Sequence, residues 1–229
     1  MIQEKFGKTE KIIQNLAVSC YNGYASIGKD FPKMINERLK RQINFILEAD
    51  KEKEVYRQTH ISGYKRFEND AEHAWHMAIM VYLLKEYANE PFDLSRAMIM
   101  ALIHDVVEID AGDTYAYDEE AKKSQKERED RAAERIFGLL PEDQRSEFNA
   151  LFREFEAGET PEARFARAMD NLQPLLLNDL NDGGDWKRRG VSEEKVMGRQ
   201  EKTALGSKLL WEFSKGIIEE NTKKGNLKK

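Results

Sequence analysis

The sequence lacks most features that mark secreted, membrane or polyanion-binding proteins. Its single cysteine, Cys20, cannot form an internal disulfide bond and is too few for a thiolate metal cage. The longest purely apolar run, Ala97 to Ile103, is far shorter than the about 20 residues of a membrane helix. The 37 basic and 42 acidic residues give a net charge of −5, so there is no basic excess for coating long nucleic acids. We therefore expect a cytoplasmic protein that binds neither a membrane nor a long nucleic acid.

Proline and glycine are also scarce, at 5 and 14 residues, and they lie mostly between segments of helical periodicity. In residues 70–87, apolar side chains recur every three or four positions, as on one face of a helix. The next predicted helix contains residues 97–103, is apolar nearly all round and is expected to continue to Glu108, as the buried centre of a bundle. Two further helices are predicted to begin at Pro161 and after Ser192. No strand pair is expected, so the predicted fold class is all-α.

The length of 229 residues fits one domain. Residues 1–30 show weak periodicity and are interpreted as an accessory arm, and residues 31–229 as a single domain. The charged stretch 51–66 is expected to form a short helix or turn, 53–58, followed by a loop. The lysine-rich tail after residue 222 is expected to be frayed.

Three predicted helices carry ionisable residues at apolar positions. His104 and Asp105 follow the most apolar run of the chain, where burying an imidazole and a carboxylate is costly unless a partner compensates. This pair alone could equally be a core histidine hydrogen-bonded to a carboxylate. His73 and Asp170 lie on the apolar faces of two other helices. A shared metal site formed by all four residues is the simplest account.

The ligand set of this predicted site combines imidazole nitrogens with carboxylate oxygens. Such a set suits Mn, Fe, Co, Ni or Zn better than Ca or Mg. Glu108 lies four residues after His104 and three after Asp105, so it is expected on the same side of the helix.

The order and spacing of these residues resemble the H…HD…D motif of the HD-domain metal-dependent phosphohydrolases. The motif is formed here by Glu72-His73, His104-Asp105 and Asp170. The string from His104 to Asp113, HDVVEIDAGD, is similar to the HDxxExxxGD segment of the 5'-deoxynucleotidase branch of that family. The resemblance extends from about residue 35 to about residue 181.

The resemblance implies an all-α HD-domain helical bundle with the metal site in its core. It implies hydrolysis of a phosphate monoester by a 5'-nucleotidase-like enzyme with one divalent ion, which could be Mn, Co, Fe, Ni, Zn or Mg. The ion would activate water and polarise the phosphoryl group, and Glu108 would orient or deprotonate that water. The implied metal ligands are His73, His104, Asp105 and Asp170.

The resemblance also implies substrate-binding residues. Arg57 matches the family arginine before the first ligand helix, and its planar guanidinium suits phosphate oxygens. Asp113 would contact the sugar side or assist the leaving alkoxide. In bacterial deoxynucleotidases the arginine is followed by a tryptophan that crowds a ribose hydroxyl, whereas Gln58 and Thr59 follow here. Ribonucleotides and other small phosphates therefore stay open as substrates.

Two other functions are compatible with the motif. One is an HD phosphodiesterase or pyrophosphohydrolase, and the other is a non-catalytic, metal-stabilised module that binds nucleotides. The extra acids Glu108 and Asp113 favour an enzyme, because a purely structural metal site has no need of them. The expected partner is a small phosphorylated substrate, most simply a nucleotide. Relatives of this kind are commonly dimers, so a homodimer is expected.

Overall fold

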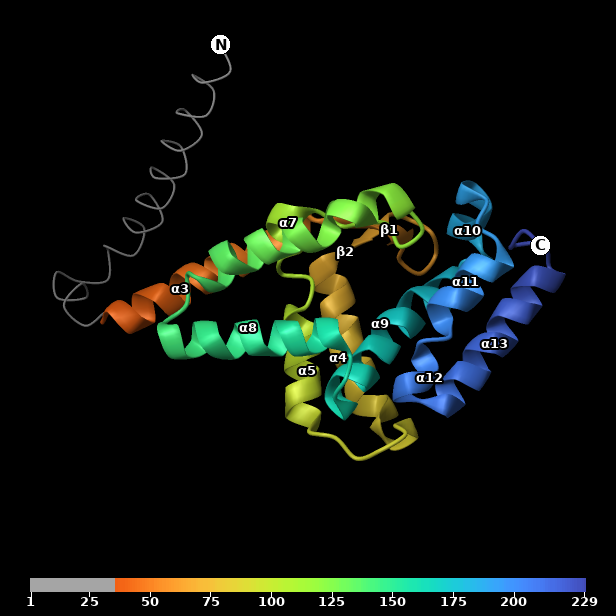
Figure 1. Cartoon of the computed structure of the whole chain (residues 1–229). Helices are drawn as coiled ribbons and strands as arrows, with labels where there is room; N and C mark the ends of the chain where they lie inside the picture. The colour runs from red at the N-terminus through yellow and green to blue at the C-terminus, as the bar shows by residue number, and fades with distance from the viewer. Residues whose placement is uncertain (1–35) are drawn as a thin grey trace, which may run out of the picture. The chain divides into compact units, whose positions relative to one another are not determined.

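The computed structural model describes residues 36–229, which are predominantly helical (Figure 1). The chain divides into two units, residues 1–43 and 44–229, and helix α3 (Glu37–Ala49) contains the boundary. The predicted accessory arm, residues 1–30, lies outside the described residues. Within the described part, none of the helices combines the length and the apolar composition that crossing a membrane requires.

The second unit consists of helices and one small antiparallel hairpin. The helices are α4 (Asp70–Leu84), α5 (Leu94–Ile103), α6 (Glu108–Ala111), α7 (Glu119–Phe137), α8 (Glu142–Ala157), α9 (Pro161–Leu180), α10 (Gly184–Arg189), α11 (Glu193–Gln200), α12 (Thr203–Gly206) and α13 (Lys208–Lys223). Two 3₁₀ helices are η2 (Asp50–Glu54) and η3 (Lys85–Tyr87), and the strands are β1 (Tyr56–His60) and β2 (Phe67–Asn69). The predicted all-α class is confirmed.

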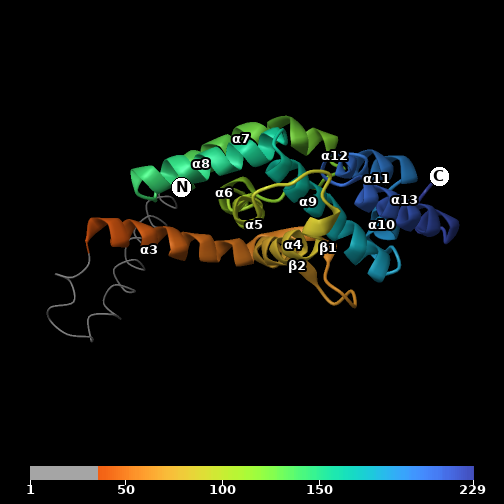
Figure 2. The same ribbon diagram turned by 90° about the horizontal axis from the view of Figure 1, so that it is seen from below.

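Helices α4, α5 and α9 form the centre of this unit and contact one another. Helices α7 and α8 lie on one side of them and α10 to α13 on the other (Figure 1, Figure 2). Met77 and Val81 of α4, Met100 of α5, and Met169 and Leu172 of α9 are fully buried, or nearly so. Met77, Met169 and Leu172 are positions of the predicted helical stripes, and Met100 lies in the helix predicted to be apolar nearly all round. Burial of this apolar surface is the main driving force for folding.

The helix predicted to reach Glu108 ends earlier. Helix α5 ends at Ile103, and a bend separates it from α6, which begins at Glu108. Turn-type hydrogen bonds replace helical ones, from Val106 N–H to the Ile103 carbonyl (3.3 Å) and from Glu108 N–H to the Asp105 carbonyl (2.8 Å). In a continuous helix, the side chains of residues 104 and 105 would diverge by about 100°. The bend instead lets both of them approach one centre.

The predicted helix or turn over residues 53–58 is wrong, and so is the expectation that no strands pair. The segment forms η2 and then β1, which pairs with β2 through Tyr56 opposite Asn69 and His60 opposite Phe67. Gly63 and Tyr64, with φ of 79° and 57°, reverse the chain between the strands. Strand β1 also contacts α9 and α10, so partners distant in sequence, which periodicity does not show, stabilise it.

The single C-terminal helix predicted after Ser192 is also wrong, because the segment forms α11, α12 and α13. The backbone of Ser207 is extended, with φ −154° and ψ 112°, and interrupts the helical path. Its hydroxyl donates to the carbonyl of Tyr87 (2.6 Å) and accepts from the N–H of Leu210 (3.2 Å). This serine therefore starts α13 and ties it to the end of η3.

The tail predicted to be frayed is packed against the unit. Lys228 N–H donates to the carbonyl of Val191 (3.0 Å), and Glu193 N–H donates to the carbonyl of Lys228 (2.8 Å). Leu227 is 4% exposed. The many lysines suggested a solvated end, but backbone pairing and one apolar anchor fix it.

Candidate metal centre and substrate pocket

The four predicted metal ligands come from three elements of the central layer. Helix α4 begins with a capping box in which Asn69 accepts from Glu72 N–H (2.9 Å), and this places His73 in the first turn. His104 and Asp105 lie in the bend after α5, and Asp170 is in the middle of α9.

The structure brings these four side chains together. His73 Nε2 lies 3.3 Å from Asp170 Oδ1 and 4.0 Å from Asp105 Oδ2. His104 Nε2 lies 3.2 Å from the same Asp105 oxygen. Ligand atoms of His73, His104 and Asp170 lie within 4.8 Å of one another and could hold a divalent metal ion. Asp105 Oδ2 adjoins this group through its approach to both histidines.

The second nitrogen of each histidine determines which tautomer can form. His104 Nδ1 lies 3.0 Å from the carbonyl oxygen of Ala101, and His73 Nδ1 lies 3.0 Å from Gln173 Oε1. Both partners are acceptors, so Nδ1 carries the proton in each ring. Both Nε2 atoms are buried without a hydrogen-bond partner among residues 36–229. In the neutral rings both Nε2 lone pairs face the centre, and this fits a metal ion better than a purely hydrogen-bonded core.

The amide of Gln173 is itself oriented by its other contacts. Its Nε2 donates to Glu68 Oε1 (2.6 Å) and lies 3.2 Å from His76 Nδ1. These two acceptors require the NH₂ group on their side, so the oxygen faces His73. Gln173 is 0% exposed, and its helix α9 also carries Asp170. One helix thus supplies a candidate ligand and the group that orients another.

Burial and neighbouring charges shift the pKa values of the ligands in opposite directions. Burial lowers the pKa of His73 to about 4, so this ring is neutral at pH 7. Burial also opposes protonation of His104, but the adjacent Asp105 carboxylate outweighs it and raises the pKa of His104 to about 9. Burial opposes ionisation of Asp105, yet the charges of His104 and Arg57 hold its pKa below the ordinary value. The centre thus keeps ionised carboxylate, as metal binding requires, and a metal ion that binds at pH 7 would displace a proton from His104.

A second group of acids adjoins this centre. Asp70, Asp105 and Glu108 bring carboxylate oxygens within 4.8 Å of one another and could also hold a cation. Burial and the neighbouring acids raise the pKa of Asp70 to about 8 and that of Glu108 well above its usual range. Arg57 compensates part of this charge, with Nη1 2.6 Å from Asp105 Oδ2 and 3.4 Å from Asp70 Oδ1. Glu108 therefore lies beside the ligands, as the spacing predicted.

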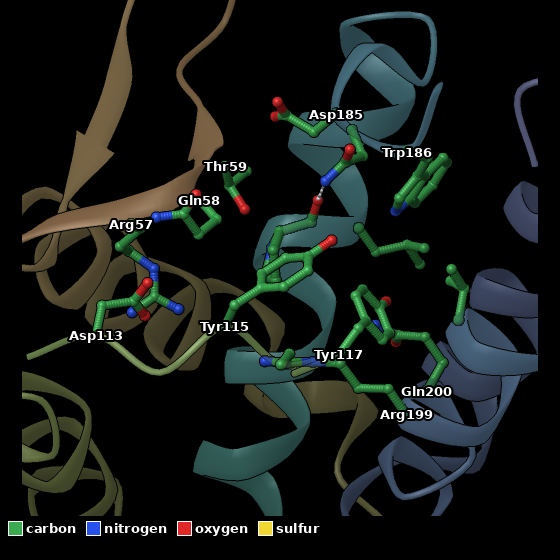
Figure 3. Close-up of a pocket in the computed structure, with 15 residues that line it drawn as sticks. Arg57, Gln58, Thr59, Asp113, Tyr115, Tyr117, Asp185, Trp186, Arg199 and Gln200 are labelled. Carbon is green, nitrogen blue, oxygen red and sulfur yellow. Dashed lines mark hydrogen bonds between the residues drawn. The ribbon is translucent and has the colours of Figure 1, made fainter. Parts of the chain in front are cut away.

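A pocket opens beside Arg57 and Asp113, the two predicted substrate-binding residues (Figure 3). Gly112, at φ 74° and ψ 146°, turns the chain into Asp113, and burial raises the pKa of that carboxyl. Tyr115 and its neighbours from the segment after α6 form one wall. The other walls come from α9, α10 and α11, and include Asn178, Trp186, Arg199 and Gln200.

Sequence reasoning missed several members of the site. Gln173 had a signal, because it follows Asp170 by three residues and so shares its helix face. Glu68 and Asp70 precede the first ligand, but their burial depends on the hairpin. Arg199 had no signal, because it lies on α11, outside the motif.

The chain belongs to the HD domain family, whose profile matches residues 49–211. It is 32% identical over 112 residues to human 5'-deoxynucleotidase HDDC2. The alignment covers 49% of this chain and 53% of the human protein. It is 28% identical over 118 residues to 5'-deoxynucleotidase hdd1 of Schizosaccharomyces pombe. That alignment covers 49% of this chain and 58% of the relative. The chain thus spans about half the length of the curated relatives it matches.

A solved structure extends the similarity over nearly the whole chain. The crystal structure of a predicted metal-dependent phosphohydrolase from Magnetospirillum magnetotacticum MS-1 is 47% identical, with a TM-score of 0.81. The structural alignment covers 87% of this chain and 98% of the chain in that crystal structure. The resemblance to the HD-domain phosphohydrolases is therefore confirmed.

Proposed function

We propose that this protein is a metal-dependent phosphohydrolase that removes phosphate from a nucleoside 5'-monophosphate. The observation that carries the proposal is the convergence of two buried imidazole Nε2 atoms and two carboxylates beside a pocket that contains an arginine. The names of the similar proteins, 5'-deoxynucleotidase and predicted metal-dependent phosphohydrolase, support it.

In this proposal His73, His104, Asp105 and Asp170 hold one divalent ion. The two nitrogens and two oxygens suit Mn, Fe, Co, Ni or Zn, and Mg is a further candidate. The bound ion supplies Lewis-acid activation of water and of the phosphoryl group. The protein fixes the ligands, because Gln173 and the Ala101 carbonyl hold the two rings.

The neighbouring residues have separate roles in the proposed reaction. Glu108 is buried beside Asp105, and the charge of a bound metal ion would favour its ionised form, so that it would orient the attacking water or accept its proton as a general base. Asp113 faces the pocket with an oxygen that has no hydrogen-bond partner among the described residues, and it contacts the sugar or the leaving oxygen. Arg57 lines the same pocket and offers its guanidinium to the phosphate.

The sugar preference depends on the part of the pocket wall formed by the two residues after Arg57. Gln58 and Thr59 line it, and Gln58 Oε1 accepts from Arg189 Nη2. A polar side chain here leaves room for hydrogen bonding to a ribose hydroxyl. We therefore include ribonucleotides beside deoxynucleotides among the substrates.

A phosphate-release assay tests the proposal. The metal-free protein is loaded separately with Mn²⁺, Co²⁺, Zn²⁺ or Mg²⁺ and given each deoxy- and ribonucleoside 5'-monophosphate, with a phosphodiester and a pyrophosphate for comparison. We expect inorganic phosphate from monoesters and none from Glu108→Gln, although that variant keeps its metal. Release from no substrate by metal-loaded protein would contradict the proposal and favour a non-catalytic binding module. Cleavage of the diester or pyrophosphate alone would favour the other HD activities.

We also propose that the protein forms a homodimer through the outer face of α4. Trp75, Tyr82 and Leu83 on this helix are 62%, 51% and 62% exposed, which is unusual for large apolar side chains on one surface. Light scattering tests this, and we expect Trp75→Glu with Leu83→Glu to give monomers. Leu180→Glu, at an exposed residue of α9, is the matched control. A double variant that stays dimeric would exclude this face.

A cytoplasmic location is the remaining part of the proposal. The single cysteine supports it, because a chain that cannot form an internal disulfide bond is typical of a reducing compartment. Cell fractionation with an antibody to the protein tests this, and recovery in a membrane or extracellular fraction would contradict it.

A further inference from the structure

Neighbouring carboxylates already occupy part of the Arg57 guanidinium that would bind a phosphate in the pocket. Asp70, Asp105, Glu108 and Asp113 lie at one end of the site, and Arg57 is the cation in contact with them. Its Nη1 is shared between two of these carboxylates. A phosphate monoester carries up to two negative charges, so a further cation facing it would strengthen its binding beside the bound metal ion and the shared Arg57.

Arg199 is such a cation. It lies on α11 and lines the same pocket as Arg57 and Asp113. Figure 3 shows its side chain reaching from the α11 side of the pocket toward the end that holds Asp113. Its charge lowers the pKa values of both Asp113 and Asp170, opposing the burial that raises them.

Two N–H donor groups of the Arg199 guanidinium, Nε and Nη2, lack a good acceptor within the described residues. Its Nε is buried and has no hydrogen-bond partner there. Its Nη2 lies 3.6 Å from Asp170 Oδ2, which is longer than a hydrogen bond. A buried guanidinium N–H without an acceptor is costly, so such a group points to an acceptor that arrives with a ligand.

We propose that Arg199 is a second phosphate-binding residue, which takes the substrate phosphate from the side of the pocket opposite Arg57. The inference rests on the proposed function and extends it, because it assigns the phosphate a binding site formed by two arginines from different parts of the chain. Guanidinium groups suit this role, because their planar N–H pairs match phosphate oxygens.

The variants Arg199→Gln and Arg199→Lys test the role. With Mn²⁺-loaded protein we expect Arg199→Gln to lower kcat/KM for nucleoside monophosphates about 10- to 100-fold, the effect of losing a charge-assisted hydrogen bond. Arg199→Lys restores part of the loss. The inhibition constant of inorganic phosphate rises by a similar factor, whereas inhibition by the nucleoside without phosphate does not change. Lys195→Gln, an exposed residue of the same helix, is the matched control and has no effect.

Metal content and direct binding separate the alternatives. Calorimetric titration of Mn²⁺-loaded protein with inorganic phosphate needs no turnover, so it tests Arg199 even if the proposed activity fails. Unchanged phosphate affinity in a folded Arg199→Gln protein would overturn the inference. Loss of Mn²⁺ from Arg199→Gln, or an equal loss of nucleoside binding, would also overturn it, because Arg199 would then act by holding Asp170 or shaping the pocket. Thermal unfolding of both variants confirms that they are folded.

Discussion

Replacing Gln173 by leucine should weaken metal binding, although Gln173 is not a ligand. Leucine has a similar size but cannot accept the Nδ1 proton of His73, which now lies 3.0 Å from the amide oxygen. Without that acceptor the ring can move its proton to Nε2, the atom that faces the metal centre. Outer hydrogen bonds of this kind typically change metal affinity 10- to 100-fold, or about 1.4–2.8 kcal/mol.

The same substitution should also destabilise the metal-free protein. It leaves two buried groups unpaired, His73 Nδ1–H and Glu68 Oε1, and the latter now accepts from the amide at 2.6 Å. Each unpaired buried group costs about 1–3 kcal/mol, so we expect a loss of at least about 2 kcal/mol. Gln173→Glu keeps an acceptor for His73 but turns a carboxylate toward Glu68. It should therefore bind metal more tightly than Gln173→Leu while remaining less stable than wild type.

Calorimetric titration of metal-free protein with Mn²⁺ measures the loss of metal affinity. Urea unfolding in the presence of a chelator measures the loss of stability. Gln125→Leu is the matched control, because Gln125 donates to buried Glu129 (2.7 Å) but contacts none of the four candidate ligands. It should cost stability without changing Mn²⁺ affinity. If folded Gln173→Leu bound Mn²⁺ within about twofold of wild type, the orienting role of the amide would be refuted.

Three further predictions concern stability. Burial raises the pKa of Glu52 from its ordinary value of 4.5 to about 7, so its stabilising contribution is complete below pH 4.5 and is lost as the pH rises through 7. Glu52→Gln should therefore stabilise metal-free protein at pH 8 by at most about 3 kcal/mol and have little effect at pH 4.5, and equal urea midpoints at pH 8 would contradict this. Gly112→Ala should cost about 1–3 kcal/mol in thermal unfolding, because φ 74° with ψ 146° suits glycine alone. Gly206→Ala should cost a similar amount, since its Cβ would lie 2.4 Å from the Arg164 carbonyl oxygen, whereas Gly198→Ala, with open space around it, should not.

Local physics made the central helices predictable. The three- and four-residue recurrence in residues 70–87 marks the face that α4 buries, and Thr160 caps α9 by accepting from Ala163 N–H (3.2 Å). The convergence of the candidate metal ligands was predictable for a related reason. Burying His104, Asp105 and Asp170 among apolar residues is costly, and that cost suggested a shared site before any geometry was known.

The features that sequence reasoning missed depend on contacts distant in the chain. The hairpin forms because β1 meets β2 and α9, although its own residues look like a charged helix or loop. The bend after Ile103 brings His104 and Asp105 toward one centre. The helical pattern of the sequence continues through the bend, so it gives no sign that the helix ends there. The Glu68–Gln173 contact joins residues 105 positions apart, and no local pattern encodes such a pair.

The packed C-terminal tail has a practical consequence for producing the protein. Asn226 is 5% exposed and donates to Asn221 Oδ1 (2.7 Å), next to buried Leu227. Trimming the last few residues would therefore uncover the junction between α10 and α11 and leave Val191 without its backbone partner. A purification handle fused after residue 229 would begin close to the same junction, so a flexible spacer between them is the better choice for expression and crystallisation.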